Sequence, residues 1–507
     1  MSLLARLARR VAQQPSAEAL VHGAERLTYG DLWSAIGSAS TQLRALRMPR
    51  GARIGLLLEN SPCYAACYYA VHAVGGVVVP LNPAARATEI AGHLNHCTAS
   101  ALIVAAGHPE LDALRIAAPD VQVFDAEALC SGGARVAFTE PVPEAPACII
   151  YTSGTTGRPK GVTLSHRNLD INTRSILAYL PLSPADCLVN VLPFHYAYGN
   201  SVLHTHLIAG ARLVLDRSMV YPRGVLQAME AERASGFSGV PSTFAVLLSR
   251  ADPAAHDLRS LRYLTQAGGC MSTHLAQRVR QAFPAAKLFV MYGQTEASAR
   301  LAYLPPERLD DKPGSVGIAI PGVELKIHDE HGREVAPDVT GEIWARGENI
   351  MLGYWNDADA TRQVLANGWL KTGDLAHRDS DGYIYIDGRR SEMIKCGAHR
   401  INPQEVEEVI AQLDGVDDVA CTGIPDELLG QVVKAVIVQR AGGNLSPKAV
   451  QRHCRERLPP YKVPRAIAFV EVLPRTASGK VQRYLLRDSD HTKGEWDVST
   501  GTEYARG

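Results

Sequence analysis

The sequence lacks an excess of charge of either sign. Among its 507 residues, 52 Lys and Arg balance 52 Asp and Glu, so the formal net charge is zero. Proteins that bind nucleic acid usually carry a basic surplus, and we therefore expect no nucleic-acid partner. Hydrophobic residues make up 46% and charged residues 21%, which is typical of globular proteins and excludes a chain that is disordered throughout. At ~150 residues per domain, the length predicts about three domain-sized parts.

The sequence also lacks long hydrophobic runs and paired cysteines. The longest apolar run, around residues 70–81, is shorter than the ~18 residues that a membrane span needs. None of the ten cysteines forms a CxxC pair, so we expect buried free thiols in a reducing cytosol and no structural zinc site. Residues 1–15 are basic and amphipathic without a sustained apolar core, which favours a first helix over a signal peptide. We expect a cytoplasmic protein without a membrane span.

The order of strand and helix signals predicts an α/β fold. In the first 300 residues, short apolar runs typical of buried strands alternate with longer segments of helical period. The strands are expected at 53–58, 77–81, 101–105, 121–124, 187–192, 212–215 and 287–291. The helices are expected at 27–46, 62–74, 223–233 and 273–283. This alternation is typical of parallel sheets that helices cover on both faces.

The pattern of strand and helix signals changes after residue 323. Short strand signals separated by turns such as Asp381-Gly382 and Asp387-Gly388 predict an antiparallel β unit up to residue 385. A compact pattern of helices and strands follows Gly388. We therefore expect a large N-terminal domain, 1–388, of two parallel-type αβα subdomains plus a small β-barrel-like subdomain, and a small α+β domain, 389–507.

The strongest local signal is the segment 151–162, YTSGTTGRPKGV, which directly follows the apolar run 148–150. Glycines let backbone N–H groups approach an anion closely, Ser and Thr hydroxyls add donors, and Lys160 adds a positive charge. The segment predicts a loop that binds a polyphosphate, although a flexible turn would share part of this composition. It is not a Walker loop, because Gly161 and not Ser or Thr follows Lys160.

Six further motifs follow this loop in sequence. They are Pro193-Phe194-His195 with Gly199, Ala267-Gly268-Gly269, Tyr292-Gly293-Gln294-Thr295-Glu296, Thr372-Gly373-Asp374, Asp387-Gly388-Arg389 and Pro474-Arg475-Thr476-Ala477-Ser478-Gly479-Lys480. Together with the loop, these motifs resemble the ANL superfamily of adenylate-forming enzymes. That superfamily contains acyl-CoA synthetases, peptide-synthetase adenylation domains and luciferases. The resemblance covers nearly the whole chain, from residue 27 to residue 480.

The resemblance implies an AMP-forming ligase that uses ATP and Mg²⁺ in two half-reactions. A carboxylate first attacks the α-phosphorus of ATP, giving an acyl-adenylate and pyrophosphate. A thiol then attacks the activated carbonyl, and AMP leaves. In the family the small C-terminal domain rotates between the two halves. Ser391 departs from the family pattern, in which the hinge residue is commonly Asp or Lys.

The resemblance also assigns roles to individual residues. The catalytic candidates are Lys480, Thr295, Glu296 and His195, and the candidates for holding Mg²⁺ are Glu296 and Thr156. The candidates for binding ATP are Thr152, Ser153, Gly154, Thr155, Thr156, Gly157, Lys160, Gly268, Gly269, Tyr292, Gly293, Gln294, Asp374, Ile386 and Arg389. The chemistry agrees, because the two oxygens of Asp374 suit a ribose diol and the carboxylate of Glu296 suits Mg²⁺. Taken alone, the same Asp would more often be a turn cap, and Glu296 or Arg389 a surface charge.

The acid is expected to lack an α-amino group. Amino-acid-activating relatives place an Asp after the Phe of the acyl-pocket motif, whereas this chain has His195, which is mostly neutral at pH 7 and is a poor partner for an ammonium group. We expect a fatty or aryl acid. His195 is alternatively a gating or packing residue. The candidate pocket residues are His195, Tyr198, Gly199, Gly239, Gln266 and Gly293.

The acceptor is expected to be coenzyme A. Lys395, Gly397 and Arg400 lie in the segment that faces the thiol tunnel in relatives, where cations would suit the phosphates of CoA. The alternative is the phosphopantetheine thiol of a separate acyl carrier protein. Luciferase-like oxygenation and a non-enzymatic scaffold are the remaining alternatives. The expected partners are thus a small-molecule acid and CoA, and the expected assembly is a monomer or a homodimer.

Overall fold

The computed structural model divides the chain into two compact units. The first contains Met1–Lys326 and Trp344–Thr372, and the second contains Ile327–Ile343 and Gly373–Gly507. The described residues are 1–152, 160–215, 218–389, 392–397, 399–440, 442–443, 445–475, 481–487, 496–497 and 502–503. The chain passes between the units within β16 (Val323–His328), β17 (Gly341–Gly347) and β20 (Trp369–Arg378). The boundary expected at 388–389 concerns which part rotates, and it stays a prediction.

A nine-stranded sheet forms one half of the first unit. Its order is β15 (Ile318–Ala319), β14 (Ala302–Leu304), β13 (Lys287–Tyr292), β12 (Tyr263–Gln266), β11 (Gly236–Gly239), β9 (Cys187–Asn190), β10 (Arg212–Val214), β1 (Glu18–His22) and β2 (Glu25–Thr28). The strands from β13 to β1 pair in parallel, and β14, β15 and β2 are antiparallel at the edges. The expected parallel sheet is therefore present with antiparallel margins.

A seven-stranded sheet forms the other half of the first unit. Its order is β18 (Gly353–Tyr354), β8 (Lys160–Ser165), β7 (Pro146–Thr152), β4 (Val77–Pro80), β3 (Arg53–Leu57), β5 (Ala101–Val104) and β6 (Gln122–Asp125). The strands from β7 to β6 are parallel, whereas β8 is antiparallel to β7 and to β18. The antiparallel hairpin of β7 and β8 carries the Gly-rich segment between its strands.

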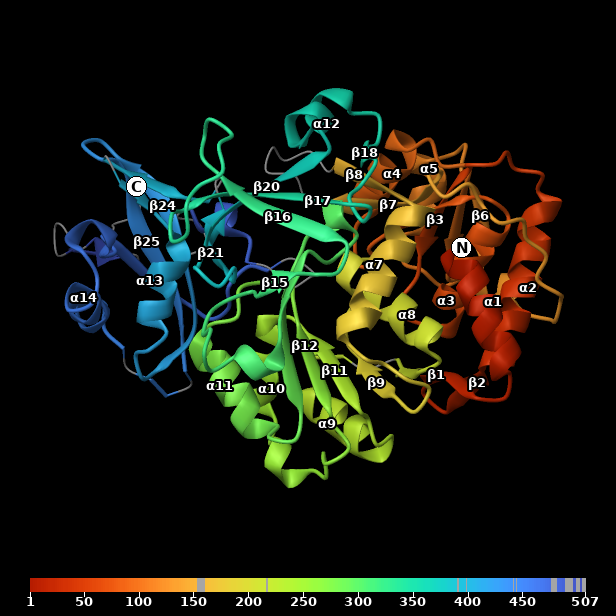
Figure 1. Ribbon diagram of the computed structural model, residues 1–507, viewed down its shortest axis with the longest axis horizontal. Helices are drawn as coiled ribbons and strands as arrows, with labels where there is room; N and C mark the ends of the chain where they lie inside the picture. Colours follow the sequence, from red (N-terminus) through yellow and green to blue (C-terminus); the bar gives the residue numbers. More distant parts are fainter. Residues whose placement is uncertain are drawn as a thin grey trace. The chain divides into compact units, whose positions relative to one another are not determined.

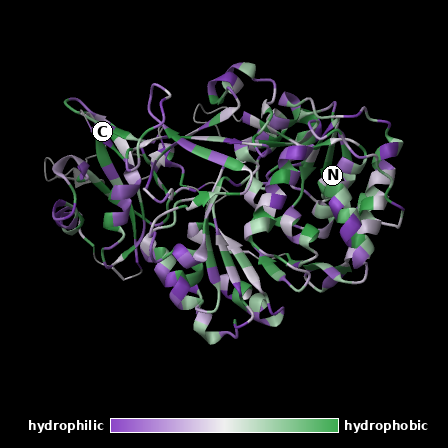
Figure 2. Ribbon diagram, in the orientation of Figure 1, coloured by the Kyte–Doolittle hydropathy of each residue, from purple (hydrophilic) through white to green (hydrophobic). Residues whose placement is uncertain are grey.

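Helices flank both sheets, as Figure 1 shows for α9, α10 and α11 beside β11 and β12. The helices of the first unit are α1 (Leu3–Gln13), α2 (Tyr29–Ala45), α3 (Pro62–Ala73), α4 (Ala87–His96), α5 (Leu111–Ala117), α6 (Ala126–Cys130), α7 (His166–Tyr179), α8 (Ala197–Ala209), α9 (Pro222–Ala231), α10 (Pro241–Arg250), α11 (Thr273–Ala282) and α12 (Ala358–Val364). Many helices carry both hydrophilic and hydrophobic residues, as covering helices do (Figure 2). None of the helices in the described part of the chain combines the length and apolar character that a membrane crossing requires.

The second unit has the small α+β pattern that the sequence predicts. Its strands and helices are β21 (Ile384–Arg389), β22 (Ile394–Cys396), β23 (His399–Ile401), α13 (Pro403–Ile410), β24 (Val416–Asp426), β25 (Gly430–Gln439), α14 (Pro447–Arg455), β26 (Ala466–Val470), β27 (Trp496–Asp497) and β28 (Thr502–Glu503). The strand β20 pairs antiparallel with β21 here, and with β19 (Leu365–Ala366) in the first unit. The mixed α/β class and the smaller C-terminal part are confirmed, and the barrel-like closure stays a prediction.

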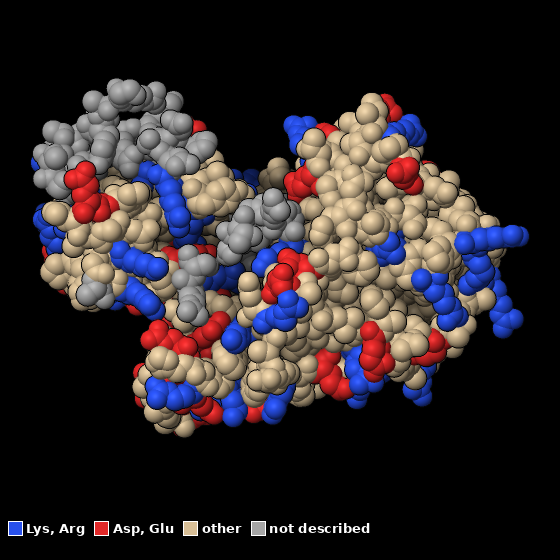
Figure 3. Space-filling model, turned by 90° about the horizontal axis from the view of Figure 1, so that it is seen from above, with Lys and Arg blue, Asp and Glu red and all other residues tan. Residues whose placement is uncertain are grey.

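The distribution of surface charge and the burial of the cysteines agree with most of what the composition predicts. Lys and Arg side chains are interspersed with Asp and Glu over the face that Figure 3 shows, so neither sign dominates it. All ten cysteines are free thiols, and seven of them are buried. Cys270 is exposed, which corrects the expectation that every thiol is buried.

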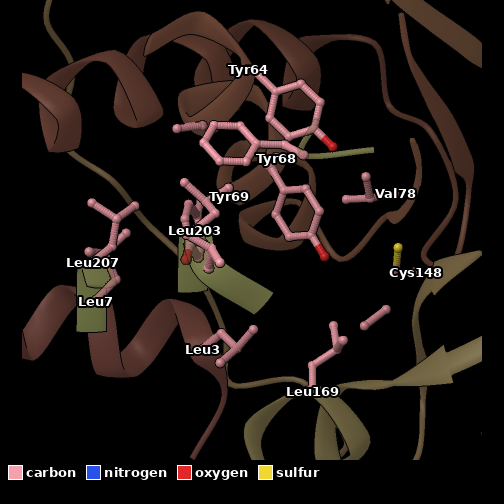
Figure 4. Close-up of a cluster of buried hydrophobic side chains, with 14 of the residues drawn as sticks. Leu3, Leu7, Tyr64, Tyr68, Tyr69, Val78, Cys148, Leu169, Leu203 and Leu207 are labelled. Atoms are coloured by element: carbon pink, nitrogen blue, oxygen red, sulfur yellow. The ribbon is translucent and has the colours of Figure 1, made fainter. Parts of the chain in front are cut away.

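The core of the first unit is unusually polar for its depth. Figure 4 shows Tyr64, Tyr68 and Tyr69 projecting from α3 among leucines from other helices. Tyr69 Oη lies 2.8 Å from Nδ1 of His204, and His204 Nε2 lies 2.9 Å from Oδ1 of Asn200. These partners fit a neutral imidazole, in which Nδ1 accepts from Tyr69 and Nε2–H donates to Asn200. Burial lowers the pKa of His204 to about 3.

We predict that the first unit loses stability as the pH falls below the ordinary histidine pKa. Burial also lowers the pKa of His166 and His206 to about 4. Because these histidines bind protons more readily when unfolded, the free energy of unfolding falls between pH ~6.5 and ~4, by at most ~1.4 kcal/mol per pH unit for each. The melting temperature measured from pH 7.5 to 4.5 checks this. His204→Gln should flatten the dependence, and the exposed control His331→Gln should not; equal slopes would contradict the assignment.

Candidate active site

Parallel pairing gathers the carboxyl ends of several strands at one edge of the nine-stranded sheet. Gly239 at the end of β11 lies opposite Gln266 at the end of β12, and Gln266 lies opposite Val290 in β13. In open α/β sheets ligands bind beyond this edge. The motif Tyr292–Glu296 begins where β13 ends, so the structure places three predicted segments at a single edge.

The Gly-rich segment connects two paired strands. The register of β7 and β8 sets Thr152 opposite Lys160, so both flanks of the predicted polyphosphate loop are fixed by the sheet. The residues between them, which include the predicted Ser153, Gly154, Thr155, Thr156 and Gly157, lie outside the described residues. The ammonium nitrogen of Lys160 lies 4.8 Å from the centroid of the Tyr354 ring, a cation–π contact.

Tyr354 joins Lys160 to Glu296. Strand β18 pairs with β8 and sets Tyr354 opposite Val162. The Tyr354 hydroxyl donates a hydrogen bond of 2.9 Å to Oε1 of Glu296. Burial, reinforced by the Glu296 carboxylate, raises the pKa of Tyr354 well above its ordinary value, so the phenol stays protonated and remains a donor. A cation, a phenol and a carboxylate are thus linked within the first unit.

Tyr354 is not among the residues that the sequence motifs predict. It lies 58 residues after Glu296 in the chain and outside every motif. The adjacent aromatic residues Tyr354 and Trp355 are of types that strands favour, which is the one local signal available. The contact itself arises from strand pairing, which no local pattern reports.

The carboxylate of Glu296 suits a magnesium ion. Oε1 accepts the bond from Tyr354, and Oε2 has no hydrogen-bond partner among the described residues. No group of three or more His, Cys, Asp or Glu side chains that could hold a metal ion occurs among those residues. Mg²⁺ is commonly held by one or two carboxylates together with substrate phosphates, so a single carboxylate fits this ion better than one that needs a complete protein cage.

The turn that presents Glu296 is tightly packed. A Cβ atom at Gly293 would lie 2.1 Å from the carbonyl oxygen of Ala299, so only glycine fits there. Ser298 has a φ of 58° and Ala299 a φ of 121°, both unusual for residues with a side chain. Such conformations persist where the surrounding packing imposes them, and they concentrate at functional sites.

The structure brings several predicted pocket residues together. The Tyr198 hydroxyl lies 2.9 Å from the carbonyl oxygen and 2.8 Å from Oγ1 of Thr265, the residue before Gln266. Gly199 packs so closely on the turn before α8 that a Cβ atom would lie 2.1 Å from the Pro193 carbonyl oxygen. Candidates on α8 and β12 are thus linked through Thr265, and strand pairing sets Gly239 of β11 opposite Gln266 of β12.

Three polar atoms near this edge are buried without a partner among the described residues. They are Nε2 of His195, Oε1 of Gln266 and Nε2 of Gln294. Leaving such atoms unpaired costs about 1–3 kcal/mol each, so a polar ligand that reaches them would gain this energy. Burial lowers the pKa of His195 to about 4, so its imidazole is neutral at pH 7.

The second unit holds the predicted ribose-binding carboxylate. The register of β20 and β21 sets Asp374 opposite Arg389, and Arg389 Nε lies 2.8 Å from Asp374 Oδ1. The Asp374 side chain is 4% exposed and the Arg389 side chain 43%. Ile386 lies in the same hairpin, opposite Ala376. The predicted hinge residue Ser391 and the predicted catalytic Lys480 lie outside the described residues.

The predicted thiol-facing cations lie in a hairpin of the second unit. Lys395 in β22 lies opposite Arg400 in β23, and both are exposed. Gly397 begins the turn with a φ of 57° and donates its N–H to the carbonyl oxygen of Leu429 at 2.7 Å. The two cations are therefore held beside each other at the surface of this unit.

Comparison with known families gives two matches. The model of the AMP-binding enzyme family matches residues 7–355, and the model of the AMP-binding enzyme C-terminal domain matches residues 405–480. An indoleacetate–CoA ligase of Aromatoleum aromaticum is 34% identical over 490 residues, 94% of this chain and 95% of the relative. A feruloyl-CoA synthase of an Amycolatopsis species is 34% identical over 481 residues, 93% of this chain and 96% of the relative.

A solved structure is similar over the same extent. The o-succinylbenzoate CoA synthetase of Bacillus subtilis in complex with its acyl-adenylate intermediate has a TM-score of 0.87 and 29% identity, covering 97% of this chain and 99% of that one. The same enzyme in complex with ATP and a magnesium ion has a TM-score of 0.86 and 29% identity, covering 95% and 99%.

We predict that Tyr354→Phe weakens the response of the protein to Mg²⁺. The substitution removes the hydrogen bond that orients Glu296 and leaves the ring over Lys160 in place. Removing such a supporting partner of a metal ligand typically costs ~10–100-fold in metal affinity. The Mg²⁺ concentration for half-maximal pyrophosphate release from ATP and an acid should rise accordingly. The exposed tyrosine control Tyr221→Phe should leave it unchanged, and an unchanged value for Tyr354→Phe would show that the bond does not position Glu296.

Proposed function

We propose, for a chain that belongs to the AMP-binding enzyme family and, like its CoA-ligase relatives, is an AMP-forming acid–CoA ligase, the residues that carry this reaction and the class of acid that it activates. The observation that carries the proposal is the link of Lys160, Tyr354 and Glu296, which sets a cation and a hard carboxylate on one tyrosine. This pairing suits a substrate with both phosphate oxygens and a bound Mg²⁺.

The residues proposed to bind the nucleotide are those that the family motifs assign. Lys160 and the hydroxyls and N–H groups of residues 152–157 bind phosphate oxygens. Gly268 and Gly269, with Tyr292, Gly293 and Gln294, face the adenine. Asp374 accepts from the ribose hydroxyls, supported by Arg389, whose guanidinium keeps the carboxylate in place. Glu296 and Thr156 hold Mg²⁺, which when bound neutralises charge on the phosphates.

The first half-reaction needs positioning more than a nucleophile from the protein. A carboxylate oxygen of the acid bonds to the α-phosphorus, and the bond from that phosphorus to the bridging oxygen breaks, so that pyrophosphate leaves. Thr295 and Lys480 stabilise the charge that develops on the phosphoryl oxygens. In the second half, the sulfur of CoA bonds to the acyl carbon, the acyl–oxygen bond breaks, AMP leaves and the thiol proton is lost to solvent.

The acid in this proposal carries no α-amino group. His195 stands at the position expected for an ammonium partner, and its buried imidazole is neutral with a pKa of about 4. A neutral, desolvated imidazole gains little from an ammonium group, whose own desolvation would be costly. The relatives named above act on indoleacetate and ferulate, which supports an aryl acid here.

Coenzyme A is the acceptor, and the exposed pair Lys395 and Arg400 is proposed to bind its phosphates. A carrier-protein thiol is not favoured. We propose a cytoplasmic location, because cysteines that form no disulfide are typical of a reducing compartment.

The activity is tested by supplying ATP, Mg²⁺ and free CoA with a panel of acids. We expect aryl acids to give AMP and the CoA thioester in equal amounts, at rates of ~1–10³ s⁻¹. Proteinogenic amino acids should give no pyrophosphate exchange above background. Exchange with amino acids alone would contradict the role of His195. Acylation of a holo carrier protein without reaction of CoA would show that the carrier protein, and not CoA, is the acceptor.

We predict that Lys480→Ala separates the two half-reactions. The lysine cation is proposed to serve only adenylate formation, so pyrophosphate release should fall by ~10²–10³-fold, as for loss of a preorganised donor. Thioester formation from synthetic acyl-adenylate and CoA should be nearly intact. Pyrophosphate release and thioester yield, measured on the same preparation, check this. Equal loss in both assays would mean that the lysine does not act in one half alone; Lys448→Ala is a control at an exposed lysine.

A further inference from the structure

One arginine in the first unit is buried without an acidic partner. Arg300 is 2% exposed, and its guanidinium forms no ion pair with any carboxylate of the described residues. Nη1 donates to the Ala299 carbonyl oxygen at 3.0 Å, and Nε lies 3.3 Å from the Met291 sulfur. The Tyr179 hydroxyl is a further hydrogen-bonding neighbour of the guanidinium. A buried guanidinium with so few acceptors is costly, because a desolvated charge needs a counter-charge.

Four other partly buried arginines of this protein each pair with a carboxylate. Arg6, Arg212, Arg475 and Arg483 have side chains that are 17–29% exposed, and they pair with Asp170, Glu18, Asp418 and Glu407, respectively. Arg300 is more deeply buried than these four and lacks the carboxylate that each of them has. The difference indicates that its counter-charge comes from outside the chain.

The position of Arg300 is fixed by its backbone. Its carbonyl oxygen accepts from Nδ2 of Asn349 at 2.9 Å and of Asn172 at 3.3 Å. It follows the strained turn at Ser298 and Ala299, four residues after Glu296. The side chain is therefore anchored to the same turn that presents the predicted magnesium ligand.

The guanidinium lies against a predicted wall of the acyl pocket. Its central carbon is 4.3 Å from the centroid of the Tyr198 ring, and Thr265 fixes the Tyr198 hydroxyl. The Tyr179 hydroxyl lies 3.1 Å from the Met291 sulfur, on the Nε side of Arg300. A cation between aromatic side chains suits a flat or short group with negative charge at its end.

We infer that Arg300 binds a second carboxylate of the acid substrate, distinct from the carboxylate that becomes adenylated. The substrates are then dicarboxylic acids, and Arg300 is a specificity-determining residue. This inference rests on the proposed function, because it takes the pocket around Tyr198 to be the acyl site. The planar guanidinium fork matches the two oxygens of a carboxylate, and a bound carboxylate supplies the missing counter-charge.

The test compares diacids with monoacids of matched shape, namely adipate with hexanoate and terephthalate with p-toluate. The wild-type protein should show a higher kcat/KM for the diacid of a pair by ~10-fold or more. Arg300→Met should lower kcat/KM for the diacid by ~10–100-fold, the value of hydrogen bonds to a charged group, and change the monoacid far less. Arg300→Lys, which keeps the charge and loses the fork, should lie between them.

Two controls separate this role from a structural one. Arg346→Met removes another arginine that stacks on an aromatic ring, 4.7 Å from the Trp369 centroid, and should leave the ratio of diacid to monoacid unchanged. Melting temperatures identify variants that fail to fold. If Arg300→Met lowers both members of a pair equally, or if the wild-type protein prefers monoacids, the inference is overturned and the ligase function stands. If the wild-type protein forms neither AMP nor thioester from any of the acids, the proposed function itself fails.

Discussion

Parallel strand pairing in the nine-stranded sheet is the constraint on which the candidate site depends. Because β9, β11, β12 and β13 run in the same direction, their carboxyl ends reach one edge, where Gly239, Gln266 and the turn after Tyr292 meet. Antiparallel neighbours would have sent alternate strand ends to the opposite edge. The pocket residues come from segments far apart in the chain, and the sheet direction alone brings them together.

Polar groups that remain unpaired inside the first unit are a consequence of that arrangement. A strand end cannot satisfy side chains that point beyond it, as His195, Gln266 and Gln294 illustrate with atoms that lack partners among the described residues. Elsewhere in the unit, Tyr69, His204 and Asn200 form a hydrogen-bonded chain, but Nδ2 of Asn200 and the Tyr64 hydroxyl also lack partners among the described residues. The three atoms at the edge of the sheet differ in their place, because ligands of α/β sheets bind beyond this edge and would complete the hydrogen bonding there.

Local sequence signals predicted most of the secondary structure and the order of the motifs. The helix after Thr28 begins with a capping box between Thr28 and Asp31, and short apolar runs mark the buried strands. Tyr354 and the environment of Arg300 could not be predicted, because each depends on which distant segment packs against it. Composition also placed Cys270 in the interior, although the structure exposes it. A sequence motif shows only residues that are neighbours in the chain. Strand pairing and the burial of the Arg300 charge depend instead on contacts between distant segments of the fold.

The register of β7 and β8 decides which face of the sheet Lys160 occupies. Thr152 and Lys160 are opposite each other, and β18 on the far side of β8 sets Tyr354 opposite Val162. Side chains alternate between the two faces of a strand, so one inserted or deleted residue that shifted β8 would turn Lys160 to the other face. The cation would then leave the Tyr354 ring. A one-residue shift of β8 would therefore separate the Lys160 cation from the tyrosine that holds the Glu296 carboxylate, and the two charges would no longer share one side chain.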